Sequence, residues 1–247
     1  MWNNGYDDSP FKDYEIRKAT VKYGITSIGE SAFLGCRGMT ELTLPNSVTS
    51  IGGNAFEGCS GLTELILPNS VTSIGNAAFV DCSGLTELIL PNSVTSIGVN
   101  AFEGCSGLTE LILPSSVTSI GDSAFSGCSG LTELTLPNGV RSIGDSAFSG
   151  CSGLTELTLP DSVASIGDGA FICCSDLSKI TSLAEIPPMC GSGVFDRVNK
   201  TNCELIVPVI SVTAYKQAEV WNEFSNIRGF SGEEATVADK TRKIVVE

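Results

Sequence analysis

The sequence predicts a repeat solenoid, a right-handed superhelix of stacked coils with short parallel β-strands, turns and short helical segments, capped at both ends. The first observation is a block that recurs every 23 residues: Leu62–Gly84 reads LTELILPNSVTSIGNAAFVDCSG and Leu85–Gly107 reads LTELILPNSVTSIGVNAFEGCSG. The second is the leucine spacing L-x-x-L-x-L, which with a period of about 20–29 residues is the signature of a leucine-rich-repeat solenoid. We expect about eight such coils.

Each coil is expected to begin with a strand. In Leu62–Pro68, Leu65 and Leu67 point to one side of the chain while Glu64 and Ile66 point to the other. This alternation is typical of a strand with one buried face. The proline that closes the segment has no N–H to donate, so it ends the strand.

The second half of each coil is expected to turn back. A second extended segment, Val71–Ile74, carries β-branched residues, and Gly75 then allows a turn with positive φ. We predict one helical turn around Ala78 and Phe79 on the outer side. Cys82 ends the coil.

Stacking the coils places equivalent side chains above one another, about 4.8 Å apart. A phenylalanine ladder is expected at Phe33, Phe56, Phe79, Phe102, Phe125, Phe148 and Phe171. A cysteine ladder is expected at Cys36, Cys59, Cys82, Cys105, Cys128, Cys151 and Cys174. Burying one such phenylalanine contributes about 1.5–3 kcal/mol.

No coil can bury its apolar face alone, so both ends need a cap. We expect an N-terminal extension over residues 1–15, the solenoid over 16–180, an irregular last coil and C-terminal cap over 181–230, and a tail or the start of a further domain over 231–247. Ile16–Gly38 is a degenerate first coil and Asn202–Pro208 a last strand. Ser211 is expected to begin a helix that covers the final coil with Val212, Tyr215, Trp221 and Phe224.

Composition narrows the function classes. The chain has 28 acidic and 14 basic residues and a net charge of −14, so we expect neither nucleic acid nor an anionic membrane as a partner. No apolar run is long enough to insert into a membrane, and the first residues lack the pattern of a signal peptide. Because the chain has no histidine, Ser–His and Cys–His catalysis are excluded, and we expect no enzyme and no catalytic residues.

Two further motifs are interpreted as structural. The string GDSAFSG, at Gly121–Gly127 and Gly144–Gly150, is similar to an esterase motif, but it recurs at the repeat register. The ladder cysteines are expected to be free, since parallel side chains have poor geometry for disulfides and no C-x-x-C spacing supports a metal site. Outside the ladder lie Cys173, Cys190 and Cys203, and a Cys190–Cys203 bridge is an alternative that the sequence leaves open.

The candidate binding site is a strip on the solvent side of the first strands, expected on a concave sheet. Its acidic column comprises Glu41, Glu64, Glu87, Glu110, Glu133 and Glu156, flanked by Lys18 and Lys179 and followed by Glu204. Its second column comprises Thr43, Ile66, Ile89, Ile112, Thr135 and Thr158. The like charges repel, which suggests that the strip docks a cationic partner, an extended peptide or the edge of a protein. Two alternatives stay open: Ca²⁺ on the acidic column, which we disfavour because we expect no cofactor and no metal, and a solvated glutamate that duplication copied along the array.

The pattern L-x-x-L-x-L-P-x-S-V-x-S-I-G-x-x-A-F-x-x-C, from about Ile16 to Ile180, resembles the BspA-like, or treponemal-type, leucine-rich repeats of bacterial surface proteins. The segment IVPVISVTAYKQAEVWNEFSNI resembles the C-terminal cap that follows such repeats.

The resemblance implies a non-enzymatic protein-binding module at the cell surface or outside the cell. It implies adhesion to host or bacterial surface proteins, among them extracellular-matrix proteins such as fibronectin and fibrinogen. We expect a monomer, since capped ends protect the edge strands from pairing with other chains. The alternative is a stalk or spacer that presents another domain.

Overall fold

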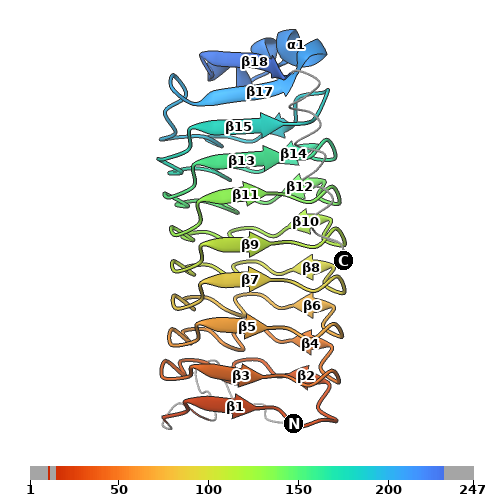
Figure 1. Ribbon diagram of the computed structural model, residues 1–247, viewed down its shortest axis with the longest axis vertical. Coiled ribbons are helices and arrows are strands. Elements are labelled where there is room, and N and C mark those ends of the chain that lie inside the picture. Colours follow the sequence, from red (N-terminus) through yellow and green to blue (C-terminus); the bar gives the residue numbers. More distant parts are fainter. Residues whose placement is uncertain (1–10, 12–14, 231–247) are drawn as a thin grey trace.

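The computed structural model describes residue 11 and residues 15–230. They form a parallel-strand β-solenoid of about 9 turns with little helix, one turn more than the eight expected. The coils stack as an almost straight column (Figure 1). Of the expected N-terminal extension only positions 11 and 15 are described, and the expected tail at 231–247 lies outside the described residues.

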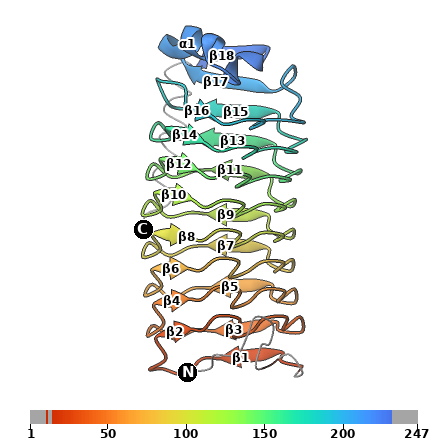
Figure 2. The ribbon, with the colours of Figure 1, turned by 180° about the vertical axis from the view of Figure 1, so that it is seen from behind.

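Two columns of parallel strands run along the solenoid (Figures 1 and 2). The first column contains β1 (Lys18–Thr20), β3 (Glu41–Thr43), β5 (Glu64–Ile66), β7 (Glu87–Ile89), β9 (Glu110–Ile112), β11 (Glu133–Thr135), β13 (Glu156–Leu159), β15 (Lys179–Ser182), β17 (Glu204–Pro208) and β18 (Asn226–Phe230). The second contains β2 (Ser27–Ile28), β4 (Ser50–Ile51), β6 (Ser73–Ile74), β8 (Ser96–Ile97), β10 (Ser119–Ile120), β12 (Ser142–Ile143), β14 (Ser165–Ile166) and β16 (Met189–Cys190).

The strand register follows the sequence repeat. Leu65 pairs with Leu88, and Leu88 with Leu111, so equivalent positions lie side by side. The predicted alternation is confirmed: Leu65 and Leu67 are buried, whereas Glu64 and Ile66 are exposed. The apolar core therefore runs unbroken between the two strand columns.

The phenylalanine ladder is confirmed. Its rings stack with centroids 5.1–5.4 Å apart and with nearly parallel planes. It is longer than predicted, because Phe11 stacks on Phe33 at one end and Phe195 on Phe171 at the other. Trp221, tilted by 58° against Phe195, closes the stack.

The cysteine ladder is also confirmed, and all ten cysteines are free. The alternative of a Cys190–Cys203 bridge is therefore wrong for this structure. Each inner ladder thiol lies against a phenylalanine carbonyl of the neighbouring coil, as in Cys82 Sγ to Phe56 O at 3.2 Å. The thiols are thus weak donors that link successive coils.

The predicted helical turn on the outer side is wrong. The segment around Ala78 and Phe79 forms consecutive non-helical turns, and both residues are completely buried. Ala77 has φ 54° and Asp81 has φ 55°, in the left-handed region that a right-handed helix cannot contain. The chain therefore reverses direction here so that the phenylalanine points into the core.

Gly75 is required for a different reason than predicted. It does not have a positive φ. A Cβ at this position would lie 2.7 Å from the backbone carbon of Gly52 in the preceding coil. The glycine therefore permits close approach of two coils rather than an unusual turn.

The C-terminal cap contains less helix than predicted. The helix α1 covers only Val212–Gln217, preceded by the 3₁₀ turn η1 (Val209–Ser211), and Ser211 makes no side-chain capping bond. Trp221 lies instead in a second 3₁₀ turn, η2 (Trp221–Glu223). The expectation that aromatic residues cover the last coil is nevertheless confirmed, since Tyr215, Trp221 and Phe224 are buried.

Hydrogen bonds fix this cap to the irregular coil before it. The Tyr215 hydroxyl lies 2.7 Å from Ser182 Oγ and donates to the Ala184 carbonyl, and Trp221 Nε1 donates to the Pro188 carbonyl at 2.8 Å. Desolvation by burial raises the pKa of Tyr215 to about 12, so the phenol stays protonated as a donor. The cap is therefore held by specific polar contacts as well as by apolar burial.

Candidate functional site

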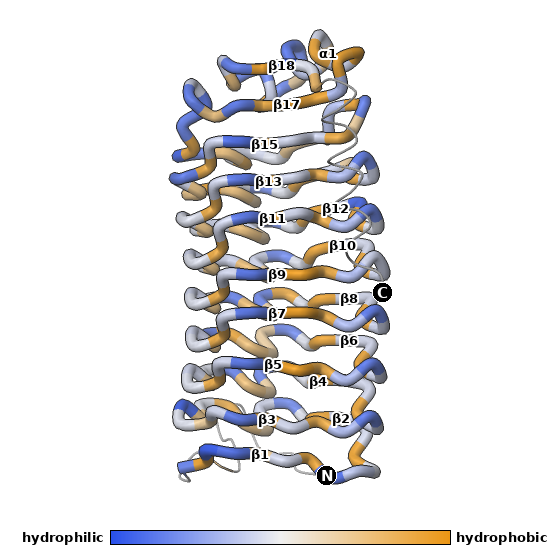
Figure 3. Tube along the Cα trace, viewed as in Figure 1, coloured by the Kyte–Doolittle hydropathy of each residue, from blue (hydrophilic) through white to orange (hydrophobic). Residues whose placement is uncertain are grey.

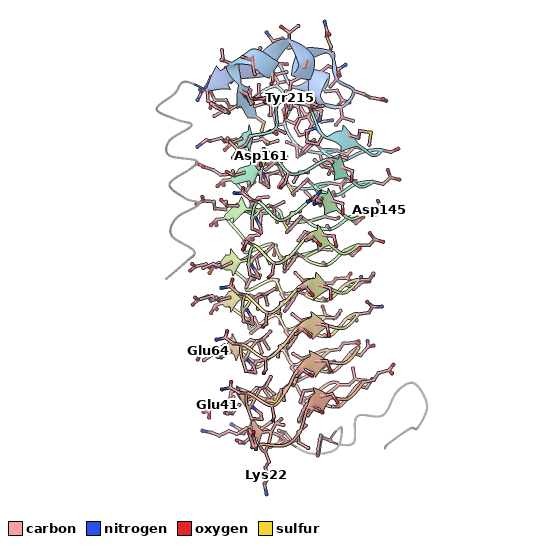
Figure 4. All side chains as sticks on the ribbon, turned by 90° about the vertical axis from the view of Figure 1, so that its right-hand side faces the viewer. Lys22, Glu41, Glu64, Asp145, Asp161 and Tyr215 are labelled. Atoms are coloured by element: carbon pink, nitrogen blue, oxygen red, sulfur yellow. The ribbon has the colours of Figure 1, made fainter. Side chains whose placement is uncertain are left out.

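The acidic column lies on the first strands, where the sequence placed it. Glu64 pairs in register with Glu87, Glu87 with Glu110, and Glu133 with Glu156. In Figure 4, Glu41 and Glu64 project from one side of the column while Asp145 lies on the opposite side. The strands that carry them stack in an almost straight column (Figure 1), so this register places the carboxylates in a row along the solenoid.

The ends of this row are neutralised by cations. The two lysines that flank the column in the sequence each form an ion pair with its terminal glutamate: Lys18 with Glu41 at 2.6 Å and Lys179 with Glu156 at 3.0 Å. Beyond Lys179, Glu204 is paired with an arginine of β18, Arg228, at 2.5 Å. The repeat pattern does not indicate this last pair, since it joins two strands, β17 and β18, that lie beyond the regular repeats.

The centre of the row is not neutralised. Glu64, Glu87, Glu110 and Glu133 make no ion pair with any of the residues that the structure describes. Each lies on a strand between neighbours that carry the same charge. Four successive coils therefore present carboxylates without an ion pair on this face.

The second column is apolar over the same coils. Ile66 and Ile89 are 68% and 49% exposed, and Ile112 is half-buried. Threonines take this position on both sides, at Thr43 toward the N-terminus and at Thr135 and Thr158 toward the C-terminus. Figure 3 shows the chain passing from hydrophilic to hydrophobic residues along β5, β7 and β9, where each glutamate is followed by a leucine and the isoleucine.

We call this centre the mixed strip. It comprises Glu64, Glu87, Glu110, Glu133, Ile66, Ile89 and Ile112. The three isoleucines lie on neighbouring coils, so their side chains form one contiguous apolar patch beside the hydrated carboxylates. The mixed strip can therefore contact a partner through both charge and apolar burial.

The aspartates of the two esterase-like GDSAFSG strings accept hydrogen bonds from backbone N–H groups of the next coil. Asp122 Oδ1 accepts from the Asp145 N–H at 3.0 Å, and Asp145 Oδ1 accepts from the Asp168 N–H at 2.8 Å. These carboxylates link each coil to the next. Within the described part of the chain, no group of three or more His, Cys, Asp or Glu residues could hold a metal ion. None of the described helices is long and apolar enough to span a membrane.

The ladder thiols are poor nucleophiles because they are buried. Desolvation by burial raises the pKa of Cys105 and of Cys151 from 9.0 to about 12. It also raises the pKa of Cys128 well above 9.0. A thiolate is the reactive form of cysteine, so the ladder is unsuited to nucleophilic or redox chemistry.

Stability is therefore expected to fall at alkaline pH. Above pH 9 the unfolded chain loses thiol protons that the folded chain keeps until about pH 12, so the free energy of unfolding decreases over this range. Each cysteine contributes up to about 1.4 kcal/mol per pH unit. Urea denaturation from pH 8 to pH 11 measures the slope. The variant Cys105→Ala/Cys151→Ala should have a shallower slope, and an unchanged slope would contradict the assignment.

Comparison with known proteins identifies close structural relatives. A family model described as the BspA type leucine rich repeat region, in six copies, matches residues 6–132 and 95–216. The crystal structure of the T. pallidum leucine-rich repeat protein TpLRR superposes with a TM-score of 0.61 and 34% identity, over 66% of this chain and 78% of that one. A leucine-rich cell surface protein of Faecalibacterium prausnitzii A2-165 superposes with a TM-score of 0.50 and 27% identity, over 70% and 61%. No curated protein matches the chain.

Proposed function

The chain belongs to the BspA-type leucine-rich repeat family, and we propose that it is a non-enzymatic protein-binding module of a bacterial cell-surface or secreted protein. Repeats of this family are generally protein-interaction modules, and one similar structure is that of a cell surface protein. We propose further that the module mediates adhesion to host or bacterial surface proteins. The partner then docks on the mixed strip.

The observation that carries this proposal is the unpaired centre of the strip. Four carboxylates without an ion pair lie beside exposed isoleucines on a rigid stack, while the row beyond them is neutralised by Lys18 and Lys179. A stalk or spacer does not require exposed isoleucines beside unpaired carboxylates, whereas a docking face does. Charge complementarity supplies specificity and association rate, and the isoleucines supply apolar area.

The test is binding of the purified chain to immobilised fibronectin, fibrinogen, collagen, laminin and whole epithelial cells. Saturable binding to one of these, weaker at high salt, is expected. Runs with and without millimolar Ca²⁺ separate direct docking from a calcium-bridged contact. No binding to any of them would favour the spacer alternative.

A single charge reversal locates the face. Glu110→Lys is expected to weaken binding about tenfold at low salt, because it places a cation in the centre of the negative row. The matched control is Glu185→Lys, which makes the same charge change at an exposed site outside the strip. Surface plasmon resonance measures both variants. Equal losses in the two would contradict a strip-specific contact.

A further inference from the structure

The mixed strip has a repeat length that a partner must match. Neighbouring strands lie about 4.8 Å apart, and the stacked rings inside these coils are spaced by 5.1–5.4 Å. One carboxylate is therefore offered every 5 Å or so along the solenoid axis. One aliphatic side chain is offered at the same interval, two residues further along each strand.

An extended peptide lying along the axis does not match this interval. Its side chains on one face repeat every 6.6–6.8 Å or so, twice the rise per residue of a strand. Over the three intervals between Glu64 and Glu133 the mismatch grows to about 6 Å, which exceeds one coil spacing. A cationic strand would therefore lose its register with the carboxylates after one or two contacts.

The pitch of an α-helix closely matches the interval between successive carboxylates. This pitch is about 5.4 Å, so one side chain per turn stays within about 2 Å of its carboxylate over the same three intervals. The flexible stem of a lysine or arginine absorbs that difference. The residues that follow the cationic ones in sequence form a second stripe, rotated by about 100° around the helix axis. This second stripe lies over the column of isoleucines.

We propose that the mixed strip binds a basic amphipathic α-helix of a partner protein, lying along the solenoid axis. One lysine or arginine per turn faces Glu64, Glu87, Glu110 and Glu133, and an adjacent aliphatic stripe packs on Ile66, Ile89 and Ile112. The proposal rests on the proposed protein-binding function and names its partner class.

The ion pairs at both ends of the acidic column limit the length of the partner helix that the strip can bind. Lys18 and Lys179 already occupy Glu41 and Glu156. A fifth cation on the helix would therefore find its carboxylate paired and a lysine beside it. The strip selects a helix with three to four basic turns, and a longer basic stripe gains no affinity.

The test uses the full chain and a designed probe. The probe is an alanine-based peptide of about 16 residues with one lysine per turn on one stripe and one leucine per turn on the adjacent stripe. Two control peptides keep its composition, one with the order scrambled and one with lysine and leucine alternating as in a strand. A third control replaces one central alanine with proline, which breaks the helix. Fluorescence anisotropy at low salt is expected to give the designed helix at least tenfold tighter binding than each control.

Two protein variants assign the contact to the strip. Glu87→Gln/Glu110→Gln is expected to weaken probe binding about tenfold, from two lost ion pairs. Its matched control, Glu185→Gln/Glu219→Gln, removes the same charge from exposed cap residues and should bind as the unmodified chain does. Ile89→Thr, which reproduces the residue at Thr135, is expected to weaken binding about threefold without loss of folding.

The outcomes separate this proposal from the proposed function. If an immobilised protein binds and Glu110→Lys weakens that binding as expected, but the helix probe binds no better than its controls, the helix proposal is overturned and the protein-binding function stands. If the scrambled or strand-like peptide binds as tightly as the helix, charge alone decides and the pitch argument is wrong. If neither the immobilised proteins nor any peptide binds, both proposals fail.

Discussion

Replacing Phe102 with alanine is expected to lower the free energy of unfolding by about 3–5 kcal/mol. The Phe102 side chain is fully buried, and its ring lies 5.1 Å from that of Phe79 and 5.4 Å from that of Phe125. Its truncation leaves a cavity between coils whose backbones are held by hydrogen bonds on both sides, as in Phe102 N–H to the Ala124 carbonyl at 2.8 Å. The cavity therefore cannot collapse, and chemical denaturation followed by circular dichroism measures the loss.

The ladder contains its own control at the N-terminal end. Phe33 is only half-buried, because the coil that carries it is the first of the stack. Phe33→Ala is expected to cost about half as much as Phe102→Ala. A Phe102→Ala variant that unfolds like the unmodified chain would show that the ring ladder does not carry the core.

Replacing Gly98 with alanine is expected to cost about 3 kcal/mol, although it adds a single methyl group. The new Cβ would lie 2.6 Å from the backbone carbon of Gly75 and 2.7 Å from the backbone nitrogen of Asn76. These atoms cannot move away without stretching the bond from Gly98 N–H to the Ile74 carbonyl, which is 3.0 Å long. The strain therefore falls on the contact between two coils, and thermal and urea denaturation both report it.

The same substitution in the first coil isolates this cause. Gly29 occupies the equivalent position, but a Cβ there meets nothing within 4 Å among the described residues, whose first coil contains it. Gly29→Ala is therefore expected to change the free energy of unfolding by less than about 0.5 kcal/mol. Equal losses in the two variants would attribute the glycine to local turn conformation and contradict the close-approach explanation.

Much of the candidate site could be predicted from the sequence, because the repeat fixes which positions lie side by side. Once the 23-residue period is recognised, positions such as Glu64 and Glu87 must lie side by side on parallel strands, and alternation places them on the solvent face. Both columns and the flanking lysines followed from this. The sequence did not reveal that Arg228 neutralises Glu204, since β18 lies outside the repeat.

The turns were harder to predict than the strands. The segment around Ala78 has good helix-forming residues, and local propensity favours the single helical turn that we expected. Burial of Phe79 and pairing with the coils on either side override that preference and force Ala77 into the left-handed region. Local preference is a weak guide where each coil is held by its neighbours.

Repetition in the sequence thus established the solenoid, its register, both side-chain ladders and the position of the strip. Neighbouring coils have nearly the same sequence, so a contact between one pair of coils recurs along the whole stack. The packing of the C-terminal cap was decided only by the tertiary structure, because the segments that meet there have different sequences. No periodicity relates Trp221 to Pro188 or Tyr215 to Ser182, and these contacts form only when the chain beyond the repeats folds back on the last coil. The ion pair of Glu204 depends on the same fold-back, because its partner Arg228 lies on β18, beyond the repeats.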